Sequence, residues 1–179
     1  MRILAISGSL RAGSSNTAVL RAAARLAPVD VDIVLFDGIA GLPFFNPDLG
    51  GDLLPAPVAA FRTQVGEADG ILISSPEYAR GVAGVLKNAL DWLVASFEFP
   101  HKPVALINTS PRATHALAAL TLTIETMSAR LVEGASITLP LLGTANDAAS
   151  IVADNTLADP LRDAIARFAA AISARRGEE

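Results

Sequence analysis

Residues suited to binding an anion gather in one short segment near the start of the chain. The segment from Gly8 to Thr17 combines small residues, several hydroxyl groups and Arg11 directly before a stretch of helical period. Backbone N–H groups at a helix N-terminus, together with a guanidinium, bind a phosphate monoester well. Neither the GxxxxGK[ST] phosphate loop nor the GxGxxG dinucleotide turn is present. The residues are compatible with a phosphate site and equally with an ordinary serine-capped turn.

A second polar segment, from Ser74 to Gly84, follows a later apolar run. It opens with Pro76 and contains two glycines and Tyr78, which is the only tyrosine in the chain. Glycines allow a backbone to approach a ligand closely, and the tyrosine lies where a planar ring could pack. The alternative is a glycine-rich turn in which Tyr78 is a surface residue.

A third segment, from Thr109 to His115, is again rich in hydroxyl groups and carries Arg112. Its alternative interpretation is a helix start that Ser110 or Thr114 caps. If all three segments meet at one edge of a sheet, they indicate one ligand with an anionic tail and a flat head.

Apolar runs of strand length alternate with stretches of helical period, which predicts a parallel sheet covered by helices on both faces. The expected strands are 3–7, 31–36, 71–75, 104–108 and 131–139, and the expected helices are 16–26, 57–67, 85–94, 117–127 and 159–176. With right-handed crossovers, the main candidate strand orders are the flavodoxin-like and the dinucleotide-binding ones. A length of 179 residues predicts one domain spanning 1–179.

Composition excludes several classes of protein. The formal net charge is −4 without a basic block, which argues against a nucleic-acid partner. Without cysteine the chain has no disulfide or thiolate nucleophile, and two histidines argue against a multi-histidine metal site. No apolar run approaches the about 18 residues of a membrane span, and the start of the chain does not resemble a secretory leader. We therefore expect a soluble cytoplasmic protein without a membrane partner.

Three spaced motifs together resemble one enzyme family. They are Gly8-Ser9-x-Arg11-x-x-Ser14-x-Asn16, Pro76-Glu77-Tyr78 and Gly84-x-Leu86-Lys87-Asn88-Ala89-x-Asp91-Trp92. They are similar to motifs of the NADPH-dependent FMN reductase family, which includes flavodoxin-like quinone, chromate and azo-dye reductases. The similarity extends from the first strand to about Trp92 and is weaker beyond Asn108. It implies an α/β fold, a flavodoxin-like three-layer sandwich whose five-stranded parallel sheet has the order 2-1-3-4-5.

The resemblance also implies which residues bind FMN, and it implies neither a catalytic side chain nor a metal. The FMN phosphate would lie at the first segment, and the ribityl chain and ring edge at the second and third. The implied residues are Ser9, Arg11, Ser14, Ser15, Asn16 and Thr17 for the phosphate, and Pro76, Glu77, Tyr78, Ala79 and Ser110 for the remainder. The chain departs from the family pattern in three places: Ala79 replaces the usual asparagine, Ala83 the usual proline, and Ser110-Pro111-Arg112 the usual glycine-rich loop.

The implied activity is that of an oxidoreductase. Hydride would pass from NADPH or NADH through bound FMN to a quinone, an azo compound, a metal oxyanion or free flavin, and Arg80 or Arg112 could receive the phosphates of the nucleotide. One alternative is a non-enzymatic flavodoxin-type electron carrier, against which Arg11 and the mild charge of −4 both count. A flavin-free α/β domain is a second alternative.

Aromatic residues in or near the proposed loops indicate a partner surface. They are Phe44, Phe45, Phe97 and Phe99. Exposed aromatic side chains favour protein–protein contact, and members of the family are usually dimers or tetramers. We therefore expect a homodimer or homotetramer that acts on a small-molecule electron acceptor.

Overall fold

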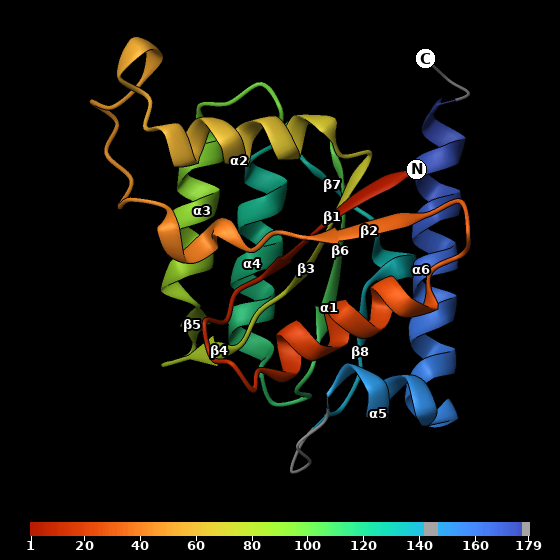
Figure 1. The fold of residues 1–179 in the computed structure, drawn as a ribbon. Coiled ribbons are helices and arrows are strands. Elements are labelled where there is room, and N and C mark those ends of the chain that lie inside the picture. Colours follow the sequence, from red (N-terminus) through yellow and green to blue (C-terminus); the bar gives the residue numbers. More distant parts are fainter. Residues whose placement is uncertain (142–146, 177–179) are drawn as a thin grey trace.

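A computed structural model describes residues 1–141 and 147–176 of the chain, with strands and helices in alternation (Figure 1). The strands are β1 (Arg2–Ser7), β2 (Asp32–Leu35), β3 (Gly70–Ser74), β4 (Glu77–Tyr78), β5 (Gly81–Val82), β6 (Pro103–Asn108), β7 (Arg130–Leu131) and β8 (Ile137–Thr138). The α-helices are α1 (Ser15–Leu26), α2 (Ala56–Glu67), α3 (Gly84–Val94), α4 (Thr114–Thr126), α5 (Ala148–Ala153) and α6 (Asn155–Arg176), and 3₁₀ turns span Gly38–Gly41, Gly51–Leu53 and Glu133–Ala135. The predicted long helices are confirmed to within a few residues, whereas α5 and the β4–β5 hairpin had no clear signal in the sequence.

The main sheet is parallel and has the order β2-β1-β3-β6-β7, which confirms the flavodoxin-like order. The predicted fifth strand, 131–139, is wrong as a single strand. Instead β7 and β8 each pair with β6 at a different end, and a 3₁₀ turn separates them. The break has a local cause, because the Ser136 hydroxyl accepts the Leu106 N–H at 3.1 Å. The side-chain oxygen of Ser136 thereby takes the place of the backbone carbonyl that would accept this N–H in a continuous strand pair.

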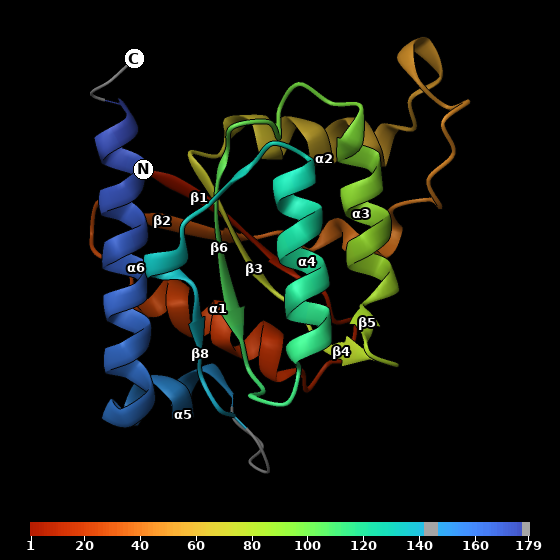
Figure 2. The ribbon, with the colours of Figure 1, turned by 180° about the vertical axis from the view of Figure 1, so that it is seen from behind.

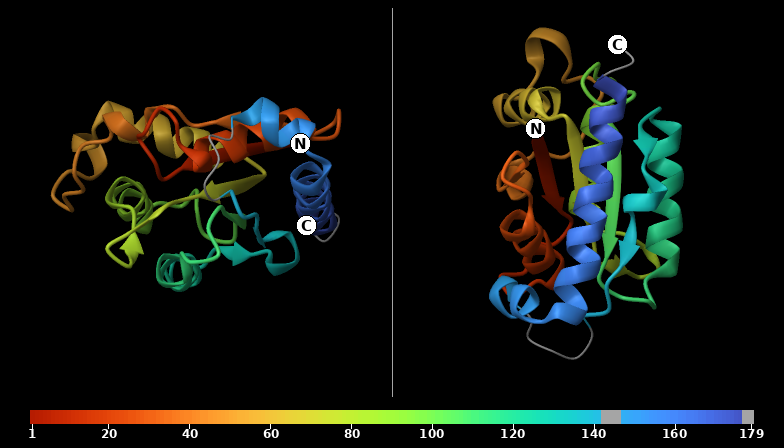
Figure 3. Two further views of the ribbon diagram at one scale, coloured as in Figure 1. Left: turned by 90° about the horizontal axis from the view of Figure 1, so that it is seen from below. Right: turned by 90° about the vertical axis from the view of Figure 1, so that its right-hand side faces the viewer.

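Successive side chains of each strand point to opposite faces of the sheet, which divides the core into two layers. Leu4 and Ile6 of β1 face the cluster that contains the buried sides of α2, α3 and α4, while Ile3 and Ala5 face the cluster that contains α1, α5 and α6. The two groups of helices lie on opposite faces of the sheet (Figures 2 and 3). This arrangement is the predicted three-layer sandwich, and it leaves the carboxyl ends of β1, β3 and β6 open between the layers.

Side chains of α3 hold the long connection after β2. Asn88 Nδ2 and Trp92 Nε1 both donate to the Pro43 carbonyl, at 3.0 Å and 2.8 Å, and Asn88 Oδ1 accepts the Phe45 N–H at 2.8 Å. The Phe45 ring and the buried Trp92 ring pack in a T-shaped arrangement, with centroids 5.1 Å apart. The third family motif therefore has a structural role here, because it fixes the loop that exposes Phe44.

One aromatic residue was assigned to the wrong environment by the sequence. Phe99 was expected near an exposed loop, but it is fully buried in the cluster of α2, α3 and α4. The segment between α3 and β6 returns across the sheet end, which carries Phe99 inward while Phe97 stays 98% exposed. Among the helices of the described residues, none is both long and apolar enough to cross a membrane.

Candidate functional site

The three polar segments meet at the carboxyl edge of the sheet, the lower edge in Figure 1. The loop after β1 touches the end of β3, because Gly8 N donates to the Ser74 carbonyl at 2.8 Å. The β4–β5 hairpin touches the start of α4, because Glu77 Oε2 accepts the Ala116 N–H at 2.8 Å. Between them lies a cavity of about 280 Å³, lined by Asn16, Ser75, Pro76, Glu77, Asn108, Thr109, Ser110, Arg112 and Ala113. The predicted meeting of the segments is confirmed.

A buried amide joins the segments. Asn16 is 6% exposed, and its Oδ1 accepts from Ser74 Oγ at 2.9 Å and from Thr109 Oγ1 at 3.2 Å. These contacts connect the first turn of α1 to the ends of β3 and β6. The Nδ2 donor of Asn16 has no partner among the described residues, and Asn16 lines the cavity. Asn16 therefore positions the loops and keeps one donor for a ligand.

Hydroxyl groups of the first segment build the turn itself. Ser14 is the N-cap of α1 and accepts the Thr17 N–H at 3.4 Å, while the Thr17 hydroxyl lies 2.8 Å from that of Ser7. Ser9 Oγ is 3.4 Å from the Arg11 backbone nitrogen. The segment is thus a serine-capped turn, which was one of the two interpretations of its sequence.

The same turn has free donors. Within the described protein, the backbone N–H groups of Ser15 and Asn16 find no acceptor, and the exposed guanidinium of Arg11 has no hydrogen-bond or ion-pair partner. Two N–H groups at a helix N-terminus and a nearby guanidinium are the donor set that a phosphate monoester requires. The capped turn therefore also leaves donors that an anion could accept.

The tip of the β4–β5 hairpin has an unusual backbone. Ala79 and Arg80 form its two-residue turn, with φ values of 50° and 60°. A left-handed conformation costs an ordinary residue roughly 1–2 kcal/mol, which is why asparagine and glycine dominate such turns. Tyr78 beside the turn is 58% exposed. Ala79, where the family usually has asparagine, thus makes this turn more costly.

A carboxylate on the hairpin caps α4. The residue before α4, Ala113, makes no side-chain cap, and the side chains of Ser110 and Thr114 do not cap the N–H groups of the helix. The prediction that one of these two residues caps the helix is therefore wrong. Glu77 fulfils the role from a distant part of the chain, since its negative charge is favourable at a helix N-terminus.

Backbone groups of the third segment form hydrogen bonds within the segment and with Asn108. Asn108 Nδ2 donates to the Ser110 carbonyl at 2.8 Å, and Asn108 Oδ1 accepts the Ser110 N–H at 3.1 Å. The Arg112 N–H donates to Ser110 Oγ at 3.3 Å, and the Ala113 N–H to the Ser110 carbonyl at 3.0 Å. These three backbone N–H groups are therefore not free for a ligand in the cavity, which Arg112 also lines.

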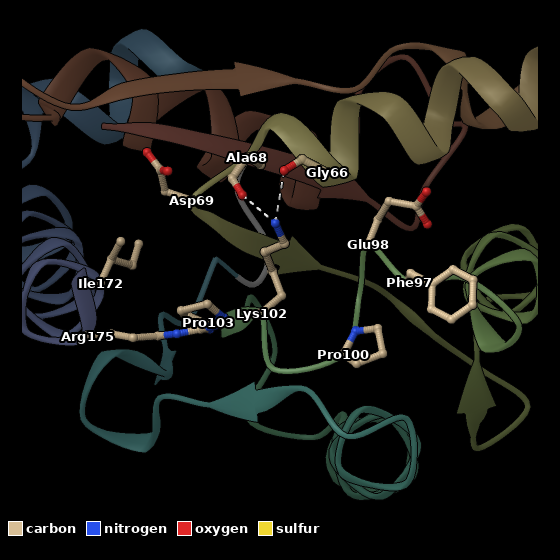
Figure 4. A pocket seen from close by; sticks show the side chains of 10 residues that line it. All are labelled: Gly66, Ala68, Asp69, Phe97, Glu98, Pro100, Lys102, Pro103, Ile172 and Arg175. Atoms are coloured by element: carbon tan, nitrogen blue, oxygen red, sulfur yellow. Dashed lines mark hydrogen bonds between the residues drawn. The ribbon is translucent and has the colours of Figure 1, made fainter. Parts of the chain in front are cut away.

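A larger cavity, about 350 Å³, lies at the amino end of β6 and holds none of the predicted site residues (Figure 4). Lys102 Nζ donates there to the carbonyls of Gly66 and Ala68 at 3.2 Å and 2.6 Å, and Arg175 donates to the His101 carbonyl. Burial lowers the pKa of Lys102, and the Asp69 carboxylate partly opposes this shift. These side chains connect the end of α2, the start of β6 and α6, so their role is structural.

The chain matches known proteins most fully in its first part. Residues 1–140 match the model of the NADPH-dependent FMN reductase family. An NAD(P)H-dependent FMN reductase from Pseudomonas aeruginosa is 44% identical over 112 residues, which are 62% of this chain and 60% of that protein. A quinone reductase from Escherichia coli is 37% identical over 115 residues, again 62% and 60% of the two chains. The matches thus span about three fifths of these curated relatives.

A solved structure is similar over nearly the whole length. It is FerB, a flavoenzyme NAD(P)H:(acceptor) oxidoreductase from Paracoccus denitrificans, with a TM-score of 0.77, 26% identity, and coverage of 96% of this chain and 97% of that chain. An NADH:FMN oxidoreductase in its apo form has a TM-score of 0.65 and 26% identity over 93% of this chain and 87% of its own.

Within the described residues, no group of three or more His, Asp or Glu side chains is placed to hold a metal ion.

The close approach of the first two loops predicts a specific effect of Gly8→Ala. A Cβ on Gly8 would lie 2.3 Å from Ser75 Oγ, 2.8 Å from Ser75 Cβ and 3.2 Å from Ser75 Cα, so rotation of the serine cannot relieve the clash. We expect a loss of about 1–3 kcal/mol in the free energy of unfolding, measured with urea. Gly41→Ala is the matched control, because its Cβ would meet no heavy atom within 4 Å. Equal stability of the two variants would contradict the close approach.

Proposed function

Because the chain belongs to the NADPH-dependent FMN reductase family, we propose that it is an FMN-dependent NAD(P)H oxidoreductase. Its acceptor would be a quinone, an azo compound, a metal oxyanion or free flavin. One observation carries the proposal: unpaired donors of a helix N-terminus lie beside a cavity of about 280 Å³ at the carboxyl edge of a flavodoxin-like sheet. Ligands of open parallel sheets bind at this edge.

The donors and the cavity fit FMN. Arg11, Ser9 and the N–H groups of Ser15 and Asn16 would hold the phosphate, and Ser14 and Thr17 would act by shaping the turn. The remaining groups lie at or beside the cavity, where they would contact the ribityl chain and the ring; they are Pro76, Glu77, Tyr78, the Ala79 backbone and Ser110. Bound FMN supplies the acceptance and donation of a hydride, so no side chain of the protein needs to act as a nucleophile.

The residues of this chain would orient the reactants. Asn16, Glu77 and Asn108 hold three loops in fixed positions, which lowers the entropy cost of assembling the site. The hairpin tip is exposed, so a nicotinamide nucleotide and then an acceptor can reach the same open face. NADPH and NADH are both candidate donors.

The extent of the functional unit follows from the packing of the last helix. Leu161, Ile165 and Phe168 of α6 belong to the same core cluster as β1 and α1. We therefore propose a single FMN-binding domain for residues 1–179. We propose the cytoplasm as its location, because the hydride donors NADH and NADPH are available there.

The visible spectrum of the purified protein tests the function. After FMN is added and excess removed, we expect a bound flavin spectrum that bleaches when NADPH or NADH is added without oxygen. Bound flavin that both nucleotides leave oxidised would instead indicate a flavodoxin-type electron carrier. Failure to bind FMN in a direct titration would refute the proposal.

Arg11→Ala tests the phosphate assignment. A charge-assisted hydrogen bond contributes about 1.5–3 kcal/mol, so we expect the Kd for FMN to rise roughly tenfold to a hundredfold. Arg130→Ala is the control, because Arg130 is also exposed but lies on β7 at the amino end of β6. Fluorescence titration of the apo-protein measures both constants, and equal affinities would remove Arg11 from the site.

Exposed apolar side chains near the end of α3 support self-association. Phe44, Val94 and Phe97 are 90%, 62% and 98% exposed, and α3 itself holds the loop that carries Phe44. Clusters of exposed apolar side chains commonly mark protein interfaces. We propose that this surface forms the interface of a homodimer or homotetramer.

Phe97→Ser is expected to lower the molar mass measured by light scattering, because it removes an aromatic side chain from the proposed interface. Val29→Ser is the matched control, since Val29 is equally exposed in the turn before β2. A monomeric mass for the unmodified protein at working concentration would contradict the proposed oligomer.

A further inference from the structure

The loop between β6 and α4 differs from the glycine-rich loop that the family resemblance leads us to expect. Asn108 and Ser110 bind the backbone N–H groups of Ser110, Arg112 and Ala113 within the loop. A glycine-rich loop commonly presents such N–H groups to a ligand. Here these N–H groups are occupied, so a positive charge at the cavity has to come from another group.

Arg112 is the group that the structure places there. It lines the cavity, and among the described lining residues it is the one with a positively charged side chain. Its guanidinium has no hydrogen-bond or ion-pair partner in the part of the chain that the structure describes. Glu77 is the carboxylate of the same lining, but its Oε2 accepts the Ala116 N–H and makes no ion pair with Arg112.

We infer that Arg112 stabilises the negative charge that arrives in this cavity with the hydride, an assignment that rests on the proposed function. A hydride carries two electrons and one proton, and therefore one net negative charge. NAD(P)H that gives it up leaves as NAD(P)⁺, and the charge remains beside the cavity lining until the acceptor takes the hydride. A cation near developing charge lowers the free energy of the charged state.

Arg112 and Arg11 would affect different properties of a bound flavin, its reduction and its binding. The charge of Arg112 favours the reduced form of a bound flavin over the oxidised form, whereas Arg11 acts on a phosphate whose charge is the same in both. Loss of Arg112 should therefore weaken binding of reduced FMN more than binding of oxidised FMN. The ratio of the two dissociation constants is fixed by the shift in midpoint potential, at about 30 mV per tenfold change for two electrons.

A redox titration of bound FMN in the full-length protein tests this assignment. The flavin is reduced with dithionite rather than NAD(P)H, so that the result does not depend on nucleotide binding. For Arg112→Gln we expect the potential to fall by the equivalent of about a tenfold loss in relative affinity for reduced FMN, or about 30 mV. Arg112→Lys should keep part of the wild-type potential, because it retains the positive charge.

Arg80→Gln is the matched control, because it removes an exposed arginine from the neighbouring hairpin outside the cavity lining. An equal shift in Arg80→Gln, or no shift in Arg112→Gln, would overturn the assignment while leaving the proposed function intact. An effect of Arg112→Gln confined to the KM for NAD(P)H would also overturn it, since that result would assign Arg112 to the nucleotide phosphates. If the wild-type protein binds no FMN, the proposed function fails first.

Discussion

The side chain of Asn16 sets the geometry of the carboxyl edge of the sheet. Its carbonyl oxygen accepts hydrogen bonds from the hydroxyls of Ser74, at the end of β3, and Thr109, directly after β6, while its backbone belongs to the first turn of α1. Loss of these donors would leave the buried carbonyl oxygen unpaired, which costs about 1–3 kcal/mol. The open helix N-terminus therefore cannot move independently of the cavity. In the proposed site, an anion held at the turn and a ring held between the other loops would keep a fixed separation.

The hairpin meets a second constraint of the same kind. Ala79 and Arg80 are both in the left-handed region, so the turn is unfavourable on its own. The carboxylate of Glu77 offsets this cost by capping α4, and so one interaction satisfies a helix end and holds a strained turn at the cavity. With Ala79 in place of the family's asparagine, the turn is thus stabilised by tertiary contacts rather than by its own sequence.

Local pattern was sufficient to predict the layers and the segments that meet at the edge of the sheet, because strand and helix periods are properties of neighbouring residues. The order of the strands was predicted from the family resemblance, since the pattern alone left two candidate orders. Contacts between distant residues were not predictable in the same way. Glu77 caps a helix 39 residues away, and Trp92 holds a carbonyl 49 residues away. The split of the last strand depends on one hydroxyl, that of Ser136, which no hydropathy pattern distinguishes from any other serine. Roles in the site were therefore less predictable than its location.

The loops around the site carry positively charged side chains, although the chain as a whole is negatively charged. The formal net charge is −4, yet each of the three loops carries one arginine, Arg11, Arg80 or Arg112, and Glu77 uses its carboxylate on a backbone N–H. The proposed reactants FMN, NAD(P)H and metal oxyanions are all anions, and a cationic edge on an anionic body would concentrate them where the donors are. The three arginines are not equivalent, because Arg112 lines the cavity while Arg11 flanks the open helix N-terminus. In the proposed enzyme, a charge beside the FMN phosphate would affect affinity alone, whereas a charge beside the cavity would also affect the direction in which a hydride moves.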